Sequence, residues 1–290
     1  MLHTILYSLA LLSLSTSPNW TKLNQMPVEV LGFYRLGIAS LLLGLFLLFK
    51  KLNISKIRNN INNKAISWAI VSGLLFFLHL WTYKYAAKNT SISNTMIIFS
   101  SNPIWASIGA VIFFNEKIGN RLIISYSLAL LGVYILVVND FNISNKINSG
   151  DSAAVVSAFF YAAYMLTGKK ARHYFDNTSY ALIQYSVCAL LFGLCILGTG
   201  AKLTPYDSNS WITIAGLILL PTFLGHFSFT YLVKYMSVSL MTCGKLIEPV
   251  LASIMAYFIF QEKVSPYAWV AFALTATSVL ILFYPNFKKK

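Results

Sequence analysis

The chain is divided into ten apolar runs of about 20 residues, separated by short stretches rich in lysine and asparagine. A helix needs roughly 20 apolar residues to cross the hydrocarbon layer of a membrane. The runs lack the alternation typical of barrel strands, and lipid offers no partner to an unpaired backbone group, so helices are favoured. The sequence therefore predicts an all-α membrane protein with ten transmembrane helices. The expected spans are residues 2–20, 27–49, 65–87, 91–114, 121–139, 151–169, 178–199, 211–233, 237–260 and 265–284.

Composition supports a lipid environment. Hydrophobic residues make up 57% of the chain and charged residues only 10%, with a mean hydropathy of +0.67. The net charge of +14 would suggest nucleic acid as the partner of a soluble domain. Here the lysines and arginines lie mainly in short stretches between the apolar runs, as expected at a membrane surface. We expect the lipid bilayer, and not nucleic acid, as the partner of this charge.

The chain contains an internal duplication. Residues 103–117 recur 146 positions later as residues 249–263, with 8 identities in 15 positions. The same frame extends backward, where residues 85–93 and 231–239 share four identities. The sequence thus predicts a first repeat in residues 1–139, a connection in residues 140–150 and a second repeat in residues 151–290.

The second repeat is expected to be inverted relative to the first. Each repeat holds five spans, an odd number, so the second copy must enter the membrane from the opposite side. Placing both termini in the cytoplasm puts 14 positive charges on that side and five on the other, as the positive-inside rule requires. Inverted repeats are typical of alternating-access carriers, which expose one central site to each side in turn.

Two proline-containing segments carry a family resemblance. Asn102-Pro103 and Glu248-Pro249 each precede small and apolar residues that end in a glutamate, and Lys169-Lys170 closes the sixth span. The pattern resembles the EamA-type ten-helix carriers of the drug/metabolite transporter superfamily. The resemblance covers essentially the whole chain. It implies two inverted five-helix repeats around a central cavity, and it leaves the solute unspecified.

Glu248 is the first candidate for binding the solute. It lies roughly 16 Å along its span, close to the midplane, where carriers bind their solutes. Lys245 lies on the same helical face, so the two form either a neutralising pair or a site that a zwitterion splits, with its ammonium on Glu248. Glu248 is also a candidate carrier of a coupling proton. Asn102 occupies the equivalent position in the first repeat, so the two halves differ chemically.

Arg35 is a second charged candidate within a span. It lies eight residues beyond Pro27, roughly 12 Å below the interface. It either bonds to carbonyls of a neighbouring helix or binds an anionic group directly. Gln184 stands at the matching position of the seventh span and joins Arg35 as a candidate substrate-binding residue.

Two histidines are candidates for proton coupling. His79 and His226 lie at mirrored positions of the third and eighth spans. Each could relay a proton near neutral pH, or it could be a hydrogen-bonded packing residue. Inversion is expected to separate them in depth, which argues against an intramembrane enzyme built around both. Among the aromatic residues, Tyr161, Tyr164 and Trp105 are candidates for lining the path, with lipid contact as the alternative.

Further residues have structural interpretations. Pro103, Pro249 and Pro221 are candidate hinges, although proline is tolerated in membrane helices without any gating role. Lys84, flanked by aromatic residues, is expected at the headgroup boundary. Glu116 and Glu262 are expected to be solvated helix ends, with a gate-closing ion pair as the alternative.

The motif search favours transport over catalysis. The sequence has no phosphate-cradling, zinc-protease, nucleophile-elbow or dinucleotide signature, so no cofactor or metal is expected. We expect a secondary carrier in a bacterial cytoplasmic membrane, moving a small polar metabolite such as an amino acid or a derivative. Its energy would come from protons or an exchanged solute, and it would act as a monomer or homodimer. A passive facilitator or pore, an intramembrane enzyme and a scaffold remain alternatives.

Overall fold

The computed structural model describes residues 2–49, 63–115, 119–144, 148–262 and 264–287. All regular structure in these ranges is helical. The first repeat contains α1 (Leu2–Ser15), α2 (Ser17–Leu23), α3 (Val28–Phe49), α5 (Asn63–Asn89), α6 (Ile92–Phe99), α7 (Asn102–Phe114) and α8 (Asn120–Ser144). The second contains α9 (Ser149–Ala171), α10 (Asn177–Thr199), α11 (Ser208–Leu217), the π-helix η1 (Ile218–Phe227), α12 (Ser228–Leu232), α13 (Val238–Gly244), the 3₁₀ turn η2 (Lys245–Ile247), α14 (Glu248–Phe260) and α15 (Pro266–Phe287).

These elements form the ten predicted spans within the described residues. Six of the spans are recognisable from length and apolar composition alone. Four spans that were predicted as single helices are interrupted: α1–α2, α6–α7, α11–η1–α12 and α13–η2–α14. The helices α2, α7 and α14, which follow three of these interruptions, each have a proline in the first turn. Proline lacks an N–H and is tolerated where no intrahelical donor is needed, so the chain restarts a helix there.

The duplication is visible in the backbone as well as in the sequence. α7 and α14 each have 13 residues and begin 146 positions apart. They end on Asn115 and Gln261, also 146 positions apart, and both residues adopt the left-handed conformation, with φ of 52° and 56°. Residues 116–118 and Lys263, at the end of the repeated segment, lie outside the described part of the chain.

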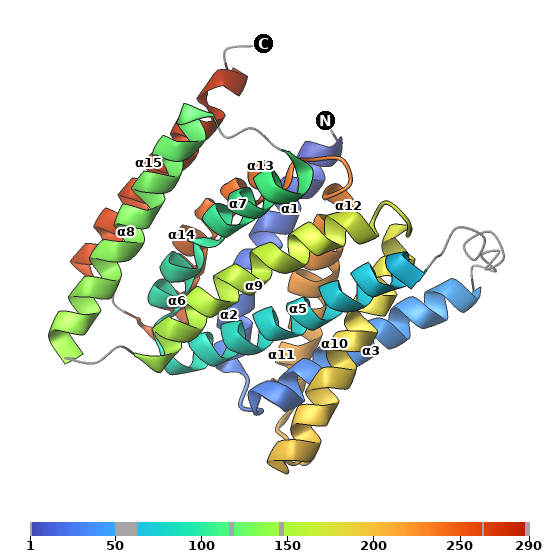
Figure 1. The fold of residues 1–290 in the computed structure, drawn as a ribbon. Helices are drawn as coiled ribbons and strands as arrows, with labels where there is room; N and C mark the ends of the chain where they lie inside the picture. Colours follow the sequence, from blue (N-terminus) through green and yellow to red (C-terminus); the bar gives the residue numbers. More distant parts are fainter. Residues whose placement is uncertain (1, 50–62, 116–118, 145–147, 263, 288–290) are drawn as a thin grey trace.

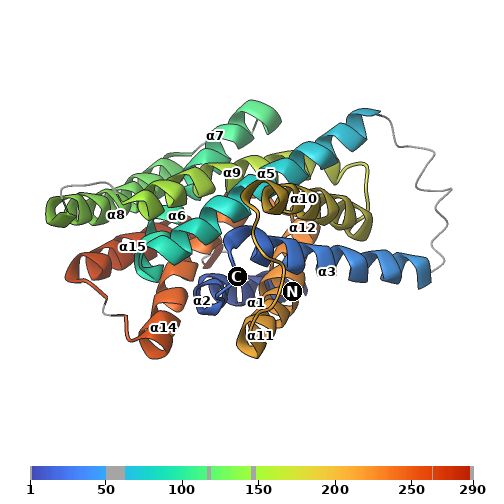
Figure 2. The same cartoon turned by 90° about the horizontal axis from the view of Figure 1, so that it is seen from below.

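The two repeats interlock along their full length. Figures 1 and 2 show α8 and α15 side by side at one end of the molecule, with α3 and α10 at the other. The long helices α5 and α9 pack against each other between these ends. Each of these three pairs joins one helix from each repeat, so the core is shared and neither half buries it alone.

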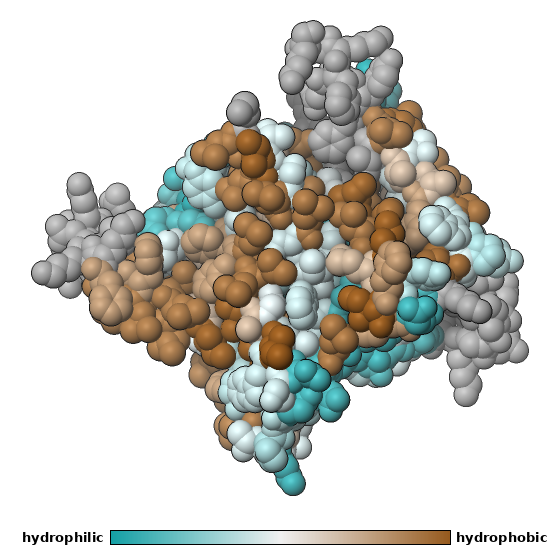
Figure 3. Space-filling model, turned by 180° about the vertical axis from the view of Figure 1, so that it is seen from behind, coloured by the Kyte–Doolittle hydropathy of each residue, from teal (hydrophilic) through white to brown (hydrophobic). Residues whose placement is uncertain are grey.

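The exterior suits a lipid environment. Large apolar side chains are widely exposed, including Phe49, Leu197 and Phe258, and apolar residues cover much of the face shown in Figure 3. The buried core holds many small residues and tyrosines. Small residues allow helices to approach closely where lipid supplies no hydrophobic driving force.

Candidate functional site

A small cavity of about 20 Å³ lies between the two repeats. It lies against α1, α2, α5 and α6 of the first repeat and against α9, η1, η2 and α14 of the second. The space corresponds to about one water molecule. Its lining residues are Leu14, Ser17, His79, Leu80, Tyr83, Phe99, Tyr161, His226, Lys245 and Glu248.

Lys245 and Glu248 form the charged pair at this cavity. Lys245 Nζ lies 2.6 Å from Glu248 Oε1, and both side chains are almost completely buried. The ammonium also lies 4.7 Å from the ring centroid of Tyr161 and 5.7 Å from that of Phe99. The break at η2 places Lys245 in a 3₁₀ turn and Glu248 at the first residue of α14. Such interruptions of membrane helices often form solute sites in carriers.

The two histidines lie close together. Their ring centroids are 6.3 Å apart, so the expectation that inversion would separate them is wrong. Both lie near the middle of their spans, and inversion moves mid-membrane residues little in depth. His79 Nδ1 lies 2.9 Å from Ser157 Oγ, and His226 Nδ1 lies 3.2 Å from the hydroxyl of Tyr164.

Arg35 and Gln184 do not form equivalent contacts. Arg35 Nε donates a hydrogen bond to Thr222 Oγ1 at 2.8 Å, which joins α3 to η1. Gln184 Nε2 donates instead to Tyr180 Oη at 3.0 Å and Ser72 Oγ at 3.3 Å. Both side chains are completely buried.

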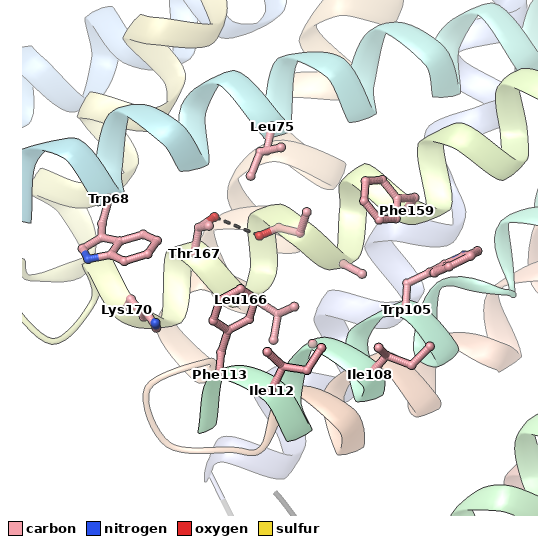
Figure 4. Close-up of a pocket in the computed structure, with 13 residues that line it drawn as sticks. Trp68, Leu75, Trp105, Ile108, Ile112, Phe113, Phe159, Leu166, Thr167 and Lys170 are labelled. Atoms are coloured by element: carbon pink, nitrogen blue, oxygen red, sulfur yellow. Dashed lines mark hydrogen bonds between the residues drawn. The ribbon is translucent and has the colours of Figure 1, made fainter. Parts of the chain in front are cut away.

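Asn102 and Trp105 lie outside the cavity lining, as do Arg35, Gln184 and Tyr164. Asn102 is buried and donates to the carbonyl of Phe99 at 2.8 Å. Trp105 is 37% exposed and packs against Phe159 at the edge of an outer groove of about 440 Å³. Figure 4 shows this groove between α5, α7 and α9, with Lys170 at one end. Its lining is almost entirely apolar, as expected of a surface in contact with lipid.

Lys84 is a buried charge that the sequence analysis misplaced. The side chain is 0% exposed and its Nζ lies 4.8 Å from the ring centroid of Phe192. It therefore does not lie at the headgroup boundary. The helical spacing could have indicated burial, because Phe76, Leu80 and Lys84 recur every fourth residue and share the buried face of α5.

One end of the bundle is closed by polar contacts near Lys22. Lys22 pairs with Glu262, whose Oε2 accepts a hydrogen bond from the backbone N–H of Ile92 at 3.0 Å. Lys88 Nζ donates to the carbonyls of Asn24 and Met26, both at 2.7 Å. Glu262 is therefore an ion-pair partner and not only a solvated helix end. Glu116, its counterpart, lies outside the described residues.

The opposite end is closed as well. The hydroxyl of Tyr7 donates to the carbonyl of Met241 at 2.8 Å, which ties α1 to α13. Arg172 Nε donates to the carbonyl of Thr230 at 3.0 Å, which ties the end of α9 to α12. The charged residues of the centre are buried in this structure, with polar contacts between helices at both ends of the bundle.

The three candidate hinge prolines all lie at irregular backbone. Pro103 and Pro249 occupy the first turns of α7 and α14. Pro221 lies inside η1, where Thr222 Oγ1 donates to the carbonyl of Leu217 at 2.8 Å, five residues earlier. Wide π-turns of this kind are frequent at functional sites.

Among the described residues, no group of histidine, cysteine and carboxylate side chains could hold a metal ion. Ten membrane spans in two repeats around a buried charged pair are typical of a multi-pass membrane transport protein. The sequence model of the EamA-like transporter family matches residues 2–138 and 148–284, and the chain belongs to that family. The family match confirms the prediction of a transporter and not an enzyme.

Individual relatives agree with this family. The chain is 25% identical over 211 residues to an uncharacterized transporter of Archaeoglobus fulgidus, covering 71% of this chain and 72% of that protein. It is 26% identical over 201 residues to the S-adenosylmethionine uptake transporter of Rickettsia felis, covering 67% of this chain and 63% of that one. A solved crystal structure with 16% identity shares the fold, with a TM-score of 0.74 over 99% of both chains.

Proposed function

We propose that the protein is a secondary carrier that moves an amino acid or an amino-acid-derived solute by alternating access. The observation that carries this proposal is the buried Lys245–Glu248 pair beside a cavity between the two repeats. The Rickettsia felis relative, named for uptake of an amino-acid derivative, supports the solute class.

The pair offers one partner to each end of a zwitterion. Glu248 receives the ammonium of the solute, and Lys245 receives its carboxylate. Tyr161 and Tyr164 lie beside the pair and the histidines and supply aromatic surface. Direct pairing with the solute replaces the contact between Lys245 and Glu248, so neither charge is left uncompensated when the pair opens.

Transport requires the bundle to open, because a cavity of about 20 Å³ is far too small for an amino acid. Separation of the contacts near Lys22 would expose the centre to one side, and separation of those near Arg172 to the other. Without a nucleotide-binding motif, the driving force is a gradient of protons or of an exchanged solute. Glu248, His79 and His226 are the proton-carrying candidates at the centre.

The proposed setting is a bacterial cytoplasmic membrane with both termini inside. The excess of positive charge predicted for that side supports it. The end closed by Lys22 and Glu262 then faces outward, and the end closed by Arg172 faces the cytoplasm. Most of the basic residues behind this orientation, including those of 50–58 and 288–290, lie outside the described part of the chain.

The test is counterflow of radiolabelled amino acids in liposomes containing purified wild type, Glu248→Gln or Glu29→Gln. Glutamine keeps an oxygen for Lys245 but cannot balance an ammonium, so we expect Glu248→Gln to reduce exchange at least ten-fold. Glu29 bonds to Thr199 at an exposed helix start, and its variant should exchange normally. Unchanged elution on gel filtration would show that both variants fold.

Exchange at the wild-type rate in Glu248→Gln would remove Glu248 from the site. Downhill movement without counterflow would favour a passive facilitator, and no movement of any amino acid would contradict the proposed solute class.

A further inference from the structure

We propose that Arg35 and Lys84 form a second, anion-binding subsite, so that the preferred solute carries a carboxylate or phosphate in addition to its zwitterionic group. The inference rests on the proposed function, because it specifies the solute of the same carrier. It predicts a solute with net negative charge.

Both side chains are buried charges with unused donors. Arg35 and Lys84 are each 0% exposed. Of the guanidinium group, only Nε is bonded, and Nη1 and Nη2 have no hydrogen-bond partner among the described residues. The ammonium of Lys84 likewise has none there. A buried donor without a hydrogen-bond partner is destabilising, and a charged donor such as these is more so.

The two cations lie near each other. Lys84 is close enough to Arg35 for their charges to interact, and Cys188 on α10 lies close to both. The ring of Phe192 is the aromatic contact of the ammonium. An aromatic ring stabilises a cation but carries no net negative charge, so this contact does not neutralise two neighbouring positive charges.

No carboxylate among the described residues balances this charge. Glu248 lies in mid-span, but it is already paired with Lys245. The other carboxylates whose side chains the structure describes lie at helix ends: Glu29, Asp151, Asp176, Asp207 and Glu262. The buried centre thus holds three cations and one anion, an excess that a negatively charged solute would neutralise.

The free end of Arg35 fits such a group. Nη1 and Nη2 present parallel N–H donors, which carboxylate and phosphate oxygens accept in a bidentate arrangement. Thr222 holds Nε and so fixes the orientation of the guanidinium plane. Lys84 adds a second positive charge within electrostatic range of Arg35.

Tyr83 connects this subsite to the cavity. It lines the cavity beside Glu248 and also lies within electrostatic range of Arg35. It is also adjacent in sequence to Lys84. A solute with its ammonium on Glu248 would therefore extend past Tyr83 to place its second acidic group between Arg35 and Lys84.

The experiment uses pairs of unlabelled solutes that differ in one acidic group. Glutamate is compared with glutamine, and phosphoserine with serine, as competitors of amino-acid counterflow in liposomes. The first pair reports a carboxylate and the second a phosphate. We expect the acidic member of at least one pair to compete about ten-fold better in wild type.

The preference should depend on the subsite. Lys84→Met should reduce it to less than about two-fold, whereas Lys202→Met, a change at an exposed lysine outside the helices, should leave it intact. Arg35→Lys keeps the charge but removes the fork, so it should weaken the acidic competitor while neutral solutes still compete.

Equal competition by acidic and neutral members in wild type would overturn the inference, even if Lys84→Met failed to fold. A preference that survived in folded Lys84→Met would do so as well. In both cases counterflow itself would still support the carrier. Complete absence of counterflow would instead contradict the proposed function.

Discussion

At the scale of single residues, the Lys245–Glu248 pair joins stability to solute binding. Two charges 2.6 Å apart in a buried site compensate each other, but neither tolerates the loss of its partner. Removing one member of a buried pair typically costs about 3–5 kcal/mol, whereas replacing both by apolar groups is often close to neutral. The pair is therefore stable while Lys245 and Glu248 contact each other. A solute that offers an opposite charge to each of them can replace that contact.

A double-mutant cycle tests this dependence. Lys245→Met and Glu248→Leu should each lower the free energy of unfolding by about 3–5 kcal/mol. The double variant should lose less than either single variant, because no uncompensated charge remains. Unfolding in mixed micelles with increasing SDS measures all four proteins. Additive losses would mean that the two side chains do not interact in solution.

The charged candidates differ in how readily the sequence reveals them. Glu248, Lys245 and Arg35 stand far inside apolar runs, where an ionisable residue is conspicuous. Lys84 stands close to the end of its predicted run with aromatic neighbours, which favoured a headgroup position. The run was predicted to end at residue 87, but α5 continues to Asn89. The longer helix, covered by α9 and α10, keeps Lys84 inside the bundle.

At the scale of elements, the interrupted helices explain how polar groups reach the centre. The pairs α6–α7 and α13–α14 break at the same repeat position, but only the second break carries Lys245 and Glu248. Hydropathy located both spans, since it measures apolar length. It could not reveal the breaks, because a proline is compatible with both a kink and a new helix start.

The contact between α1 and α13 offers a test of element packing. A Cβ atom at Gly244 would lie 1.8 Å from the hydroxyl oxygen of Tyr7, so Gly244→Ala must displace the Tyr7 ring or the helix that carries it. We expect a loss of about 1–3 kcal/mol in unfolding free energy, typical of overpacking. Gly198→Ala is the matched control, because a Cβ atom there meets nothing within 4 Å.

Alanine at position 198 should be neutral or stabilising, since alanine favours helix over glycine by about 1 kcal/mol. SDS unfolding of the two variants side by side provides the comparison. If Gly244→Ala were as stable as Gly198→Ala, the contact of the Tyr7 side chain with Gly244 would not restrict the packing of α1 against α13.

At the scale of the whole molecule, the contacts at the two ends of the bundle determine from which side of the membrane a solute has access to the centre. The Lys22–Glu262 pair joins the two repeats at the end proposed to face outward. Both side chains are partly exposed, so their interaction is worth at most about 1 kcal/mol. That is enough to shift an equilibrium between closed and open forms by about five-fold.

Labelling at Ile92 measures this shift, because Ile92 is buried and its N–H bonds to Glu262. With the three native cysteines replaced by alanine, Ile92→Cys should react slowly with an impermeant maleimide added from outside. Glu262→Gln should raise the rate by up to about five-fold, whereas Glu29→Gln should not. Reaction only from the cytoplasmic side would reverse the proposed orientation.

The overall architecture followed from the sequence because apolar length and the 146-residue duplication are both properties of the linear chain. The proximity of His79 and His226 could not be predicted from the sequence, because it depends on where α5 and η1 cross. The same limit applies to Trp105, whose helix was located correctly but whose exposed side could not be derived from one sequence.

The left-handed ends of α7 and α14 show that the two halves share one backbone plan, yet their buried charges differ. The first half supplies Arg35 and Lys84, and the second supplies Lys245 and Glu248. A symmetric dimer of the first half would concentrate four cations at its centre, and a dimer of the second would offer no guanidinium in mid-span. Each half of this chain therefore depends on the other for the charges of the centre.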